Sequence, residues 1–550
     1  MTRARKLGAT AALLAGSVLL SRVLGNAREI LLAHQIGAGA ETDAYNAAFQ
    51  IPDLLNYFLA GGALSVAFLP SYARLVAKGE TEAAQRFFGT VLGTLGAIAL
   101  LATLLLWIFA EPLVDLQFPG FSATTRALTV RMTRIVLPAQ VFFITGGIVN
   151  ATLMALGRFR AQALSPLIYN ACIILGGLVL APSLGAEGFS WGALLGALLG
   201  PFLLPLVDLY RGAKLRIAPR FAPTDRALLA YLWLAAPLML GQTLLTVDEW
   251  YGRWFGAMLG AGRVAELGFA RKLMLVPVAV VGQAVATAAL PTLARLWAER
   301  RERELHEVVL DTLRAATGLA ILLAGAVIVL APDLVTVVFR HGAFSADAAV
   351  SVGRILSILS LAIPFWVLQQ IVTRAFYARE DTWRPMILGT VIAAISIPMY
   401  WVLGHRLGVT GLAWAGVIGM TTNAVASLIL ARVVHGGPSL GAFCGTFARA
   451  CLISTAASLG AYATLFAVDA SLDAVMLWAR GPGPATDLDP SSGMLWVLAL
   501  VRSAIAGLFF LALSYGLVRL FGDEAMKSAL ARVVRRFSAR RGRAAPKDPV

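Results

Sequence analysis

Long apolar stretches, separated by short charged or Gly/Pro-rich turns, recur along the whole chain and limit the folds that it can adopt. A helix needs about 20 apolar residues to cross a bilayer. These stretches are too long and continuous for barrel strands, and a bilayer offers no water to unpaired backbone groups, so helices are predicted. The predicted spans are residues 8–37, 46–77, 86–111, 127–156, 163–182, 188–210, 227–259, 264–295, 308–331, 348–377, 385–404, 409–433, 445–468 and 494–520. The sequence thus predicts an all-α integral membrane protein with about 14 transmembrane helices.

The composition excludes a water-soluble exterior. Hydrophobic residues make up 59% of the 550 residues and charged residues only 14%, whereas soluble domains carry about 45–50% and about 25%. The net charge of +16 lies at helix ends, so nucleic acid is not an expected partner. Its bias toward alternate loops predicts that both termini are cytoplasmic. The first helix is interrupted by Arg22 and Arg28 and is read as an uncleaved span rather than a signal peptide.

The C-terminal tail is strongly basic. It either anchors the topology, the more common use of such a bias, or binds anionic lipid head groups. The cations of this tail are Lys527, Arg532, Arg535, Arg536, Arg540, Arg541, Arg543 and Lys547.

An internal repeat is visible in the sequence. The run from Leu69 to Leu75 recurs 221 residues later from Leu290 to Leu296, and Gly157-Arg158 matches Ala378-Arg379 at the same offset. Six helices per copy predict two lobes related by an axis along the membrane normal, with a substrate cavity between them. The expected domains are an N-terminal lobe (1–222), a C-terminal lobe (223–436), two extra helices with a periplasmic connector (437–522) and the basic tail (523–550).

Motifs for catalysis or structural metal binding are missing from the sequence. It has no HExxH, GxSxG or Walker A motif, and its five histidines are isolated. The cysteines, Cys172, Cys444 and Cys451, form no CxxC pair. A membrane enzyme is therefore not expected, although a signalling scaffold is left open.

Charges inside the predicted spans are the informative residues, because each costs about 2.5–3.5 kcal/mol at the bilayer centre. At about 100° per residue, Arg22 and Glu29 share a face of the first helix, and Arg28 lies about 120° away from Arg22. Arginine suits phosphate because its planar fork donates two parallel hydrogen bonds. The residues alone leave two readings open, a phosphate-bearing substrate and interhelical salt bridges.

The second lobe also carries charge within its spans. Arg271 and Lys272 would add cations to the cavity and attract a polyanion. Asp248 and Glu249 either balance these cations or bind Na⁺ or H⁺ as a coupling ion. Further charges within the predicted spans are Asp53, Arg253, Arg354 and Arg374.

Several motifs together resemble the MurJ (MviN) family of lipid II flippases, which belongs to the MATE-like MOP exporter superfamily. The resemblance covers nearly the whole chain and is most specific in the first 75 residues. The motifs are Ser21-Arg22-Val23-Leu24-Gly25, Arg28-Glu29, Gly37-Ala38-Gly39, Thr42-Asp43-Ala44, Phe49-Gln50-Ile51-Pro52-Asp53-Leu54-Leu55, Gly62-Ala63-Leu64-Ser65, Ala67-Phe68-Leu69-Pro70 and Phe376-Tyr377-Ala378-Arg379-Glu380-Asp381-Thr382.

The resemblance implies a transporter that moves undecaprenyl-pyrophosphate-linked peptidoglycan precursor from the cytoplasmic to the periplasmic leaflet of the bacterial inner membrane. It implies that Arg22 and Arg28 contact the pyrophosphate, and that Asp43 serves in the site as a gate or caps a turn. Asp248 and Asp381 become candidates for a coupling ion. Lipid II is the implied partner, for a monomer functionally linked to peptidoglycan synthesis, with no cofactor beyond a coupling Na⁺ or H⁺.

The chain also departs from the family pattern. Asn56 and Tyr57 stand where the family usually has one or two arginines, Gly61 stands for a common glutamate, and Arg271-Lys272 stands for Asp-Arg. The sequence therefore predicts a lipid II flippase that works by alternating access. The alternatives are a flippase of another undecaprenyl-linked oligosaccharide and a MATE-type drug/cation antiporter.

Overall fold

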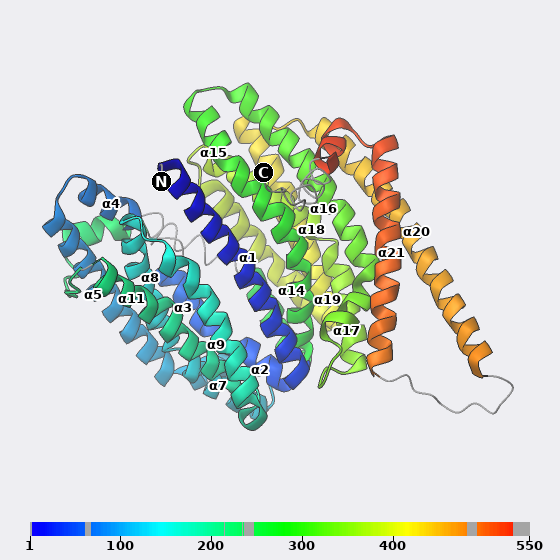
Figure 1. Ribbon diagram of the computed structural model, residues 1–550, viewed down its shortest axis with the longest axis horizontal. Coiled ribbons are helices and arrows are strands. Elements are labelled where there is room, and N and C mark those ends of the chain that lie inside the picture. The colour runs from blue at the N-terminus through cyan, green and yellow to red at the C-terminus, as the bar shows by residue number, and fades with distance from the viewer. Residues whose placement is uncertain are drawn as a thin grey trace, which may run out of the picture. The chain divides into compact units, whose positions relative to one another are not determined.

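The computed structural model describes residues 3–60, 68–213, 215–233, 235, 247–480 and 492–531 (Figure 1). It describes their side chains except at 3–12, 15, 58–60, 247, 248, 283, 284, 287, 288, 472–480 and 492. Gly61, residues 532–550 of the tail and the side chain of Asp248 thus lie outside the description. The described residues form helices without a β-strand, which confirms the all-α prediction.

The chain divides into two compact units. Unit 1 comprises Met1–Ala265 and His341–Ser345, and unit 2 comprises Glu266–Arg340 and Ala346–Val550. This division follows compactness and not the duplication, so the predicted lobe boundary at residues 222 and 223 stays a prediction.

Unit 1 is a bundle in which α9 packs against α1 and α10, and α5 packs against α8. Residues 226–233 are also helical. The helices of this unit are α1 (Arg3–Ile36), α2 (Ala40–Ala48), α3 (Gln50–Ala60), α4 (Leu69–Ala77), α5 (Thr81–Ile108), α6 (Ala110–Gln117), α7 (Ala123–Val136), α8 (Ala139–Ala155), α9 (Arg160–Leu184), α10 (Glu187–Ala197), η2 (Leu198–Leu203), α11 (Leu204–Val207), η3 (Asp208–Gly212) and α13 (Val247–Ala257).

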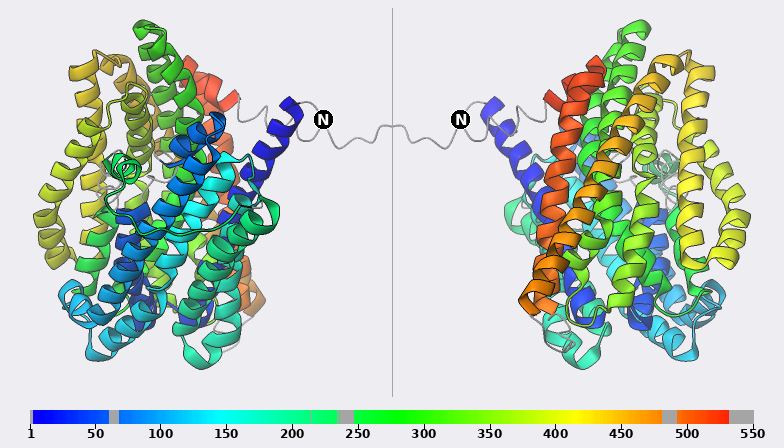
Figure 2. Two further views of the ribbon diagram at one scale, coloured as in Figure 1. Left: turned by 90° about the vertical axis from the view of Figure 1, so that its left-hand side faces the viewer. Right: turned by 90° about the vertical axis from the view of Figure 1, so that its right-hand side faces the viewer.

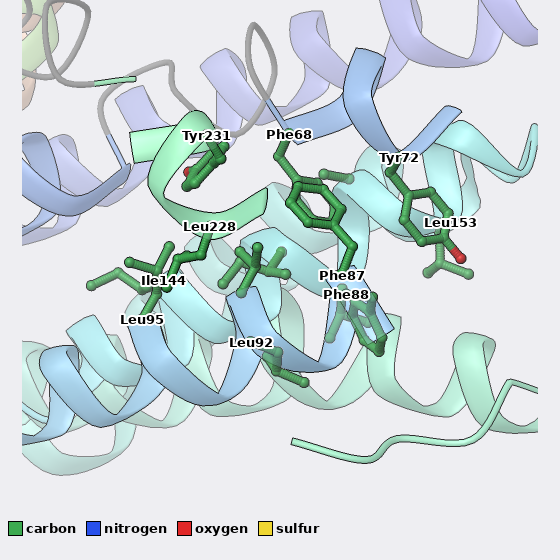
Figure 3. Packing of buried hydrophobic residues seen from close by; sticks show 14 of the residues in the cluster. Phe68, Tyr72, Phe87, Phe88, Leu92, Leu95, Ile144, Leu153, Leu228 and Tyr231 are labelled. Carbon is green, nitrogen blue, oxygen red and sulfur yellow. The ribbon is translucent and has the colours of Figure 1, made fainter. Parts of the chain in front are cut away.

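An aromatic cluster forms much of the core of unit 1 (Figure 3). The Phe68 ring stacks on Tyr72 and on Phe87, with centroids 5.8 and 5.3 Å apart, and meets Tyr231 edge-on at 6.4 Å. Edge-on and stacked ring pairs stabilise a core beyond their buried area. The helix at 226–233, which starts the seventh predicted span, is therefore packed into unit 1.

Unit 2 is built around α16, which packs against α15, α17, α18, α20 and α21. The first three residues of α14 belong to unit 1 and the rest to unit 2. The helices are α14 (Arg263–Val278), η4 (Ala279–Gln283), α15 (Ala284–Ala298), α16 (Glu302–Phe339), α17 (Ala346–Ser360), α18 (Ile363–Tyr377), α19 (Trp383–His435), α20 (Leu440–Arg480) and α21 (Ser492–Phe521).

The two C-terminal helices, α20 and α21, lie side by side within unit 2 (Figure 2). Arg502 of α21 pairs with Asp469 of α20 at 2.8 Å. Arg314 of α16 pairs with Asp523, which follows α21, at 3.1 Å. These ion pairs join α20 and α21 to each other and α21 to α16.

Within the described residues, eight helices are long and apolar enough to cross a membrane, or nine if the bent pair of α17 and α18 forms one span. The chain is therefore a multi-pass membrane protein. Helix α19 covers two of the predicted spans. The backbone at Gly408, with φ 61° and ψ −142°, is not helical and separates them. Residues 61–67 and 236–246, which belong to two further predicted spans, are outside the description. The count of fourteen stays a prediction.

Candidate functional site

Helix α1 carries the two arginines predicted to meet the substrate, and α9 holds it in place. The Ser17 hydroxyl donates a hydrogen bond to the carbonyl oxygen of Ala163. One turn further along, the Asn170 amide donates to the Ser21 hydroxyl at 3.3 Å. Polar contacts between membrane helices fix their register because lipid offers no other partner. They thereby fix the direction in which the α1 side chains point.

Arg28 is bound by its neighbour in the sequence. Its Nη2 and Nε lie 2.7 and 3.2 Å from Glu29 Oε1. The Arg28 side chain is 25% exposed and that of Glu29 only 6%. Helical spacing alone placed Glu29 on the face of Arg22, but the flexible arginine stem lets Arg28 reach around the helix to it. The phenol groups of Tyr45 and Tyr169 also interact electrostatically with this guanidinium.

Arg22 lies on the exposed surface of α1. An arginine within an apolar span is far more stable facing water or an anion than facing acyl chains. Its exposure is compatible with the predicted contact to a headgroup, and that contact stays a prediction.

A second charged group lies where α3 meets α13. Arg253 Nη2 is 2.5 Å from Glu249 Oε1, and Arg253 Nη1 is 4.0 Å from Asp53 Oδ2. Asp53 interacts electrostatically with Arg28 as well. The charges of α1, α3 and α13 therefore form one network inside unit 1.

Asp43 is completely buried and caps a helix. Its two carboxylate oxygens accept hydrogen bonds from the backbone N–H groups of Gly262 at 2.5 Å and Ala265 at 2.7 Å, at the start of α14. A carboxylate in this position satisfies orphan donors and complements the helix dipole. The geometry favours the capping role over the gating role that the sequence left open, and a role in substrate binding stays a prediction.

Arg271 and Lys272, on α14 in unit 2, both contact aromatic rings. The Arg271 guanidinium carbon lies 5.9 Å from the centre of the Trp366 ring, and Lys272 Nζ lies 5.6 Å from that of Phe269. Such contacts stabilise a cation through the ring's negative face. Arg271 and Lys272 thus lie on one helix with their charges against aromatic groups, and their binding to a headgroup stays a prediction.

Of the two coupling-ion candidates, Asp248 and Asp381, the structure describes the side chain of Asp381. The Asp248 side chain lies outside the described residues. Asp381 lies in the turn before α19, where its carboxylate is 2.8 Å from Arg384 Nη1 and 3.6 Å from His435 Nε2. Within the described residues, no three His, Cys, Asp or Glu side chains gather as a metal site would need. Ion coupling stays a prediction.

Sequence reasoning missed two features of this network. Tyr45 and Tyr169 attracted no attention because aromatic residues are common in apolar helices, yet both interact with Arg28. Asn56, noted as a departure, donates to Gln140 Oε1 at 3.0 Å. A polar residue in an apolar run was the available signal, but its partner is 84 residues away.

Known proteins resemble this chain over most of its length. Residues 32–477 match the family model described as lipid II flippase MurJ. A probable lipid II flippase MurJ of Rhizobium tropici is 30% identical over 432 residues, which are 74% of this chain and 78% of the relative. The lipid II flippase MurJ of Burkholderia cenocepacia is 27% identical over 426 residues, 74% of this chain and 81% of the relative.

Solved structures share the fold. The lipid II flippase MurJ in an inward closed conformation superposes with a TM-score of 0.74 at 21% identity, covering 92% of this chain and 99% of the other. An inward-facing multidrug resistance transporter of the MATE family gives 0.66 at 16% identity, covering 76% of this chain and 94% of the other. The likeness to the MATE transporter is one of fold. With the family match spanning four-fifths of its length, the chain belongs to the MurJ family of lipid II flippases.

Proposed function

We propose that this chain is a lipid II flippase that moves the undecaprenyl-pyrophosphate-linked peptidoglycan precursor from the cytoplasmic to the periplasmic leaflet. The observation that carries the proposal is the family match over residues 32–477. The intramembrane guanidinium of Arg28 supports it, because arginine binds phosphate oxygens through parallel charge-assisted hydrogen bonds. The protein is a transporter and performs no covalent chemistry on the lipid.

The transport step follows from the free energies of placing the charged headgroup and the polyprenyl tail in hydrocarbon. A diphosphate in hydrocarbon is strongly unfavourable, so the headgroup needs a polar path, whereas the polyprenyl tail is stable in lipid throughout. Arg28 and Arg22 would bind the diphosphate of the headgroup along this path. Alternating access would then expose it to either side in turn, driven by the membrane potential or by a Na⁺ or H⁺ gradient.

The cellular setting is part of the same proposal. The protein resides in the bacterial cytoplasmic membrane with both termini in the cytoplasm, in accord with the Lys/Arg bias of the loops. It acts as a monomer alongside the enzymes of peptidoglycan synthesis. Its basic tail contacts anionic lipids.

A depletion experiment tests the function. Cells that depend on this chain are depleted of it, and lipid II accessible from the periplasmic side is measured by labelling or enzymatic cleavage. We expect accessible lipid II to fall and the cells to lyse. Unchanged accessible lipid II with continued growth would exclude the proposal, and loss of a different lipid-linked oligosaccharide at the outer surface would favour the alternative flippase.

A further inference from the structure

Arg253 is the most shielded cation of the network in unit 1. It lies on α13, and its side chain is 17% exposed, against 39% for Asp53 and 41% for Glu249. Charged groups within apolar spans face water or protein because contact with acyl chains is costly. The partly exposed carboxylates of Asp53 and Glu249 are therefore expected to face water rather than acyl chains, with the less exposed Arg253 beside them.

Among the described side chains, the guanidinium of Arg253 has one carboxylate at hydrogen-bonding distance, that of Glu249. Nη2 is 2.5 Å from Glu249, but Nη1 is 4.0 Å from Asp53, which exceeds hydrogen-bonding distance. Nη1 can therefore donate a hydrogen bond to an incoming oxygen without first breaking the Glu249 pair. Glu249 is one turn away on the same helix, and pairs at this spacing orient an arginine before a ligand arrives.

Arg253 and Arg28 also share a neighbour. Asp53 interacts electrostatically with both guanidiniums, which come from α13 and α1. Two arginines that interact electrostatically with one carboxylate can instead interact with a diphosphate, whose several oxygens can accept hydrogen bonds from both guanidiniums. From this geometry we propose that Arg253 is a further headgroup-binding residue, which selects a diphosphate over a monophosphate together with Arg28. The inference rests on the proposed function.

The side chain of Asn56 gives this proposal an independent argument. Asn56 is one turn after Asp53 on α3 and therefore on the same side of that helix. Its amide is neutral and donates a hydrogen bond to Gln140 Oε1 at 3.0 Å. The α3 side chain at this position therefore brings no positive charge to Asp53. Arg253 brings a guanidinium to the same carboxylate from α13.

Binding by the purified full-length protein tests the proposal. The probes are polyprenyl diphosphate and polyprenyl monophosphate of equal chain length. We expect Arg253→Gln to weaken diphosphate binding about 10- to 100-fold, which is the loss of one hydrogen bond to a charged group. Monophosphate binding should change much less, so the ratio of the two affinities falls. A merely structural arginine would lower both affinities together.

Two further variants sharpen the test. Arg253→Gln combined with Asn56→Arg returns a guanidinium to the face of Asp53 and should restore much of the affinity ratio. Arg131→Gln removes a matched arginine of unit 1 that is 64% exposed and paired with Glu187 at 2.7 Å, and it should leave the ratio unchanged.

The outcomes separate this inference from the proposed function. If the unaltered protein prefers the diphosphate and Arg253→Gln keeps that preference, the inference is wrong and the flippase proposal stands. If the unaltered protein binds neither lipid and does not translocate lipid II, the proposed function fails. Should Arg253→Gln not fold, Arg253→Lys keeps the charge and loses the planar fork, and an unchanged affinity ratio in that variant overturns the inference.

Discussion

The two copies of the internal repeat place an arginine in the same turn and stabilise it in opposite ways. Arg158, between α8 and α9, lies 2.5 Å from Asp208, and this hydrogen bond raises the pKa of the guanidinium. Arg379, between α18 and α19, lies over the Trp297 ring at 5.7 Å, and burial lowers its pKa, opposed by the charge of Glu302. One copy uses a carboxylate and the other an aromatic ring.

The residues that contact these two arginines differ between the copies at both partner positions. At the repeat offset of 221 residues, the position of Asp208 is taken by Ile429, and that of Trp297 by Val76. Each copy thus has one of the two partners and an aliphatic residue in place of the other. The difference teaches that a duplicated turn can be kept while the interaction that stabilises it is replaced, so a partner cannot be transferred from one copy to the other by sequence register.

Two arginines within the apolar spans show the same contrast, since Arg28 contacts a carboxylate and Arg271 an aromatic ring. Replacing Arg28 has the largest expected effect. Arg28 of unit 1 is bound by Glu29, and we expect Arg28→Ala to abolish complementation of a depleted strain, because it removes a phosphate-binding fork and the charge that this guanidinium sets against the buried Glu29 carboxylate. Arg28→Lys should retain part of the function at most. Membrane abundance is measured by immunoblot, and the exposed Arg131→Ala serves as the control. Full activity of the alanine variant would remove Arg28 from the site.

In unit 2, Arg271 lies over Trp366, and a smaller effect is expected from removing the ring contact. A cation–π contact contributes about 0.5–2 kcal/mol, so Trp366→Leu should reduce the rate of lipid II translocation by about 2- to 30-fold. The rate is measured in proteoliposomes containing labelled lipid II. Trp366→Phe keeps a ring face and is the matched control. Equal loss in both variants would show that ring size, and not the cation contact, matters here.

The sequence predicted the helical class of the fold because hydrophobic length alone determines it. It made Arg28 a candidate site residue for a related reason, since a charge in an apolar run has few explanations, and that role stays a prediction. The sequence could not predict the cap that Asp43 forms at Gly262 or the Asn56–Gln140 hydrogen bond, because both join residues far apart in the chain. Such partners depend on how the helices pack, and helical periodicity holds no information on that.

The Arg379 and Trp297 contact predicts a change in stability. Trp297→Leu removes the ring whose centre lies 5.7 Å from the Arg379 guanidinium carbon, and we expect the free energy of unfolding to fall by about 1–2 kcal/mol. The measurement is thermal unfolding of the purified protein in detergent. Trp383→Leu, at a ring in the same unit that is 53% exposed, is the control and should change the melting temperature less. A larger loss at Trp383 would contradict the importance of the ring contact.

The Arg158 and Asp208 pair predicts a dependence on salt. Asp208→Asn should lower the melting temperature slightly in low salt, and the difference should shrink in 1 M salt, where the Debye length is about 3 Å. Partly exposed ion pairs contribute little and are screened. The effect of Trp297→Leu should be the same at both salt concentrations. If the two variants respond alike to salt, the distinction between ionic and aromatic stabilisation is lost.

The smallest expected effect comes from exchanging the partners in unit 1. Asp208→Ile should lower the melting temperature because it leaves Arg158 without its carboxylate. Val76→Trp supplies the residue that the other copy has at this place. If the repeat places both turns in the same geometry, the double variant should recover part of the loss, and a double-mutant cycle isolates that coupling from the two single effects. A purely additive result would mean that the two turns share sequence but not geometry, since a ring at position 76 would then not reach the guanidinium.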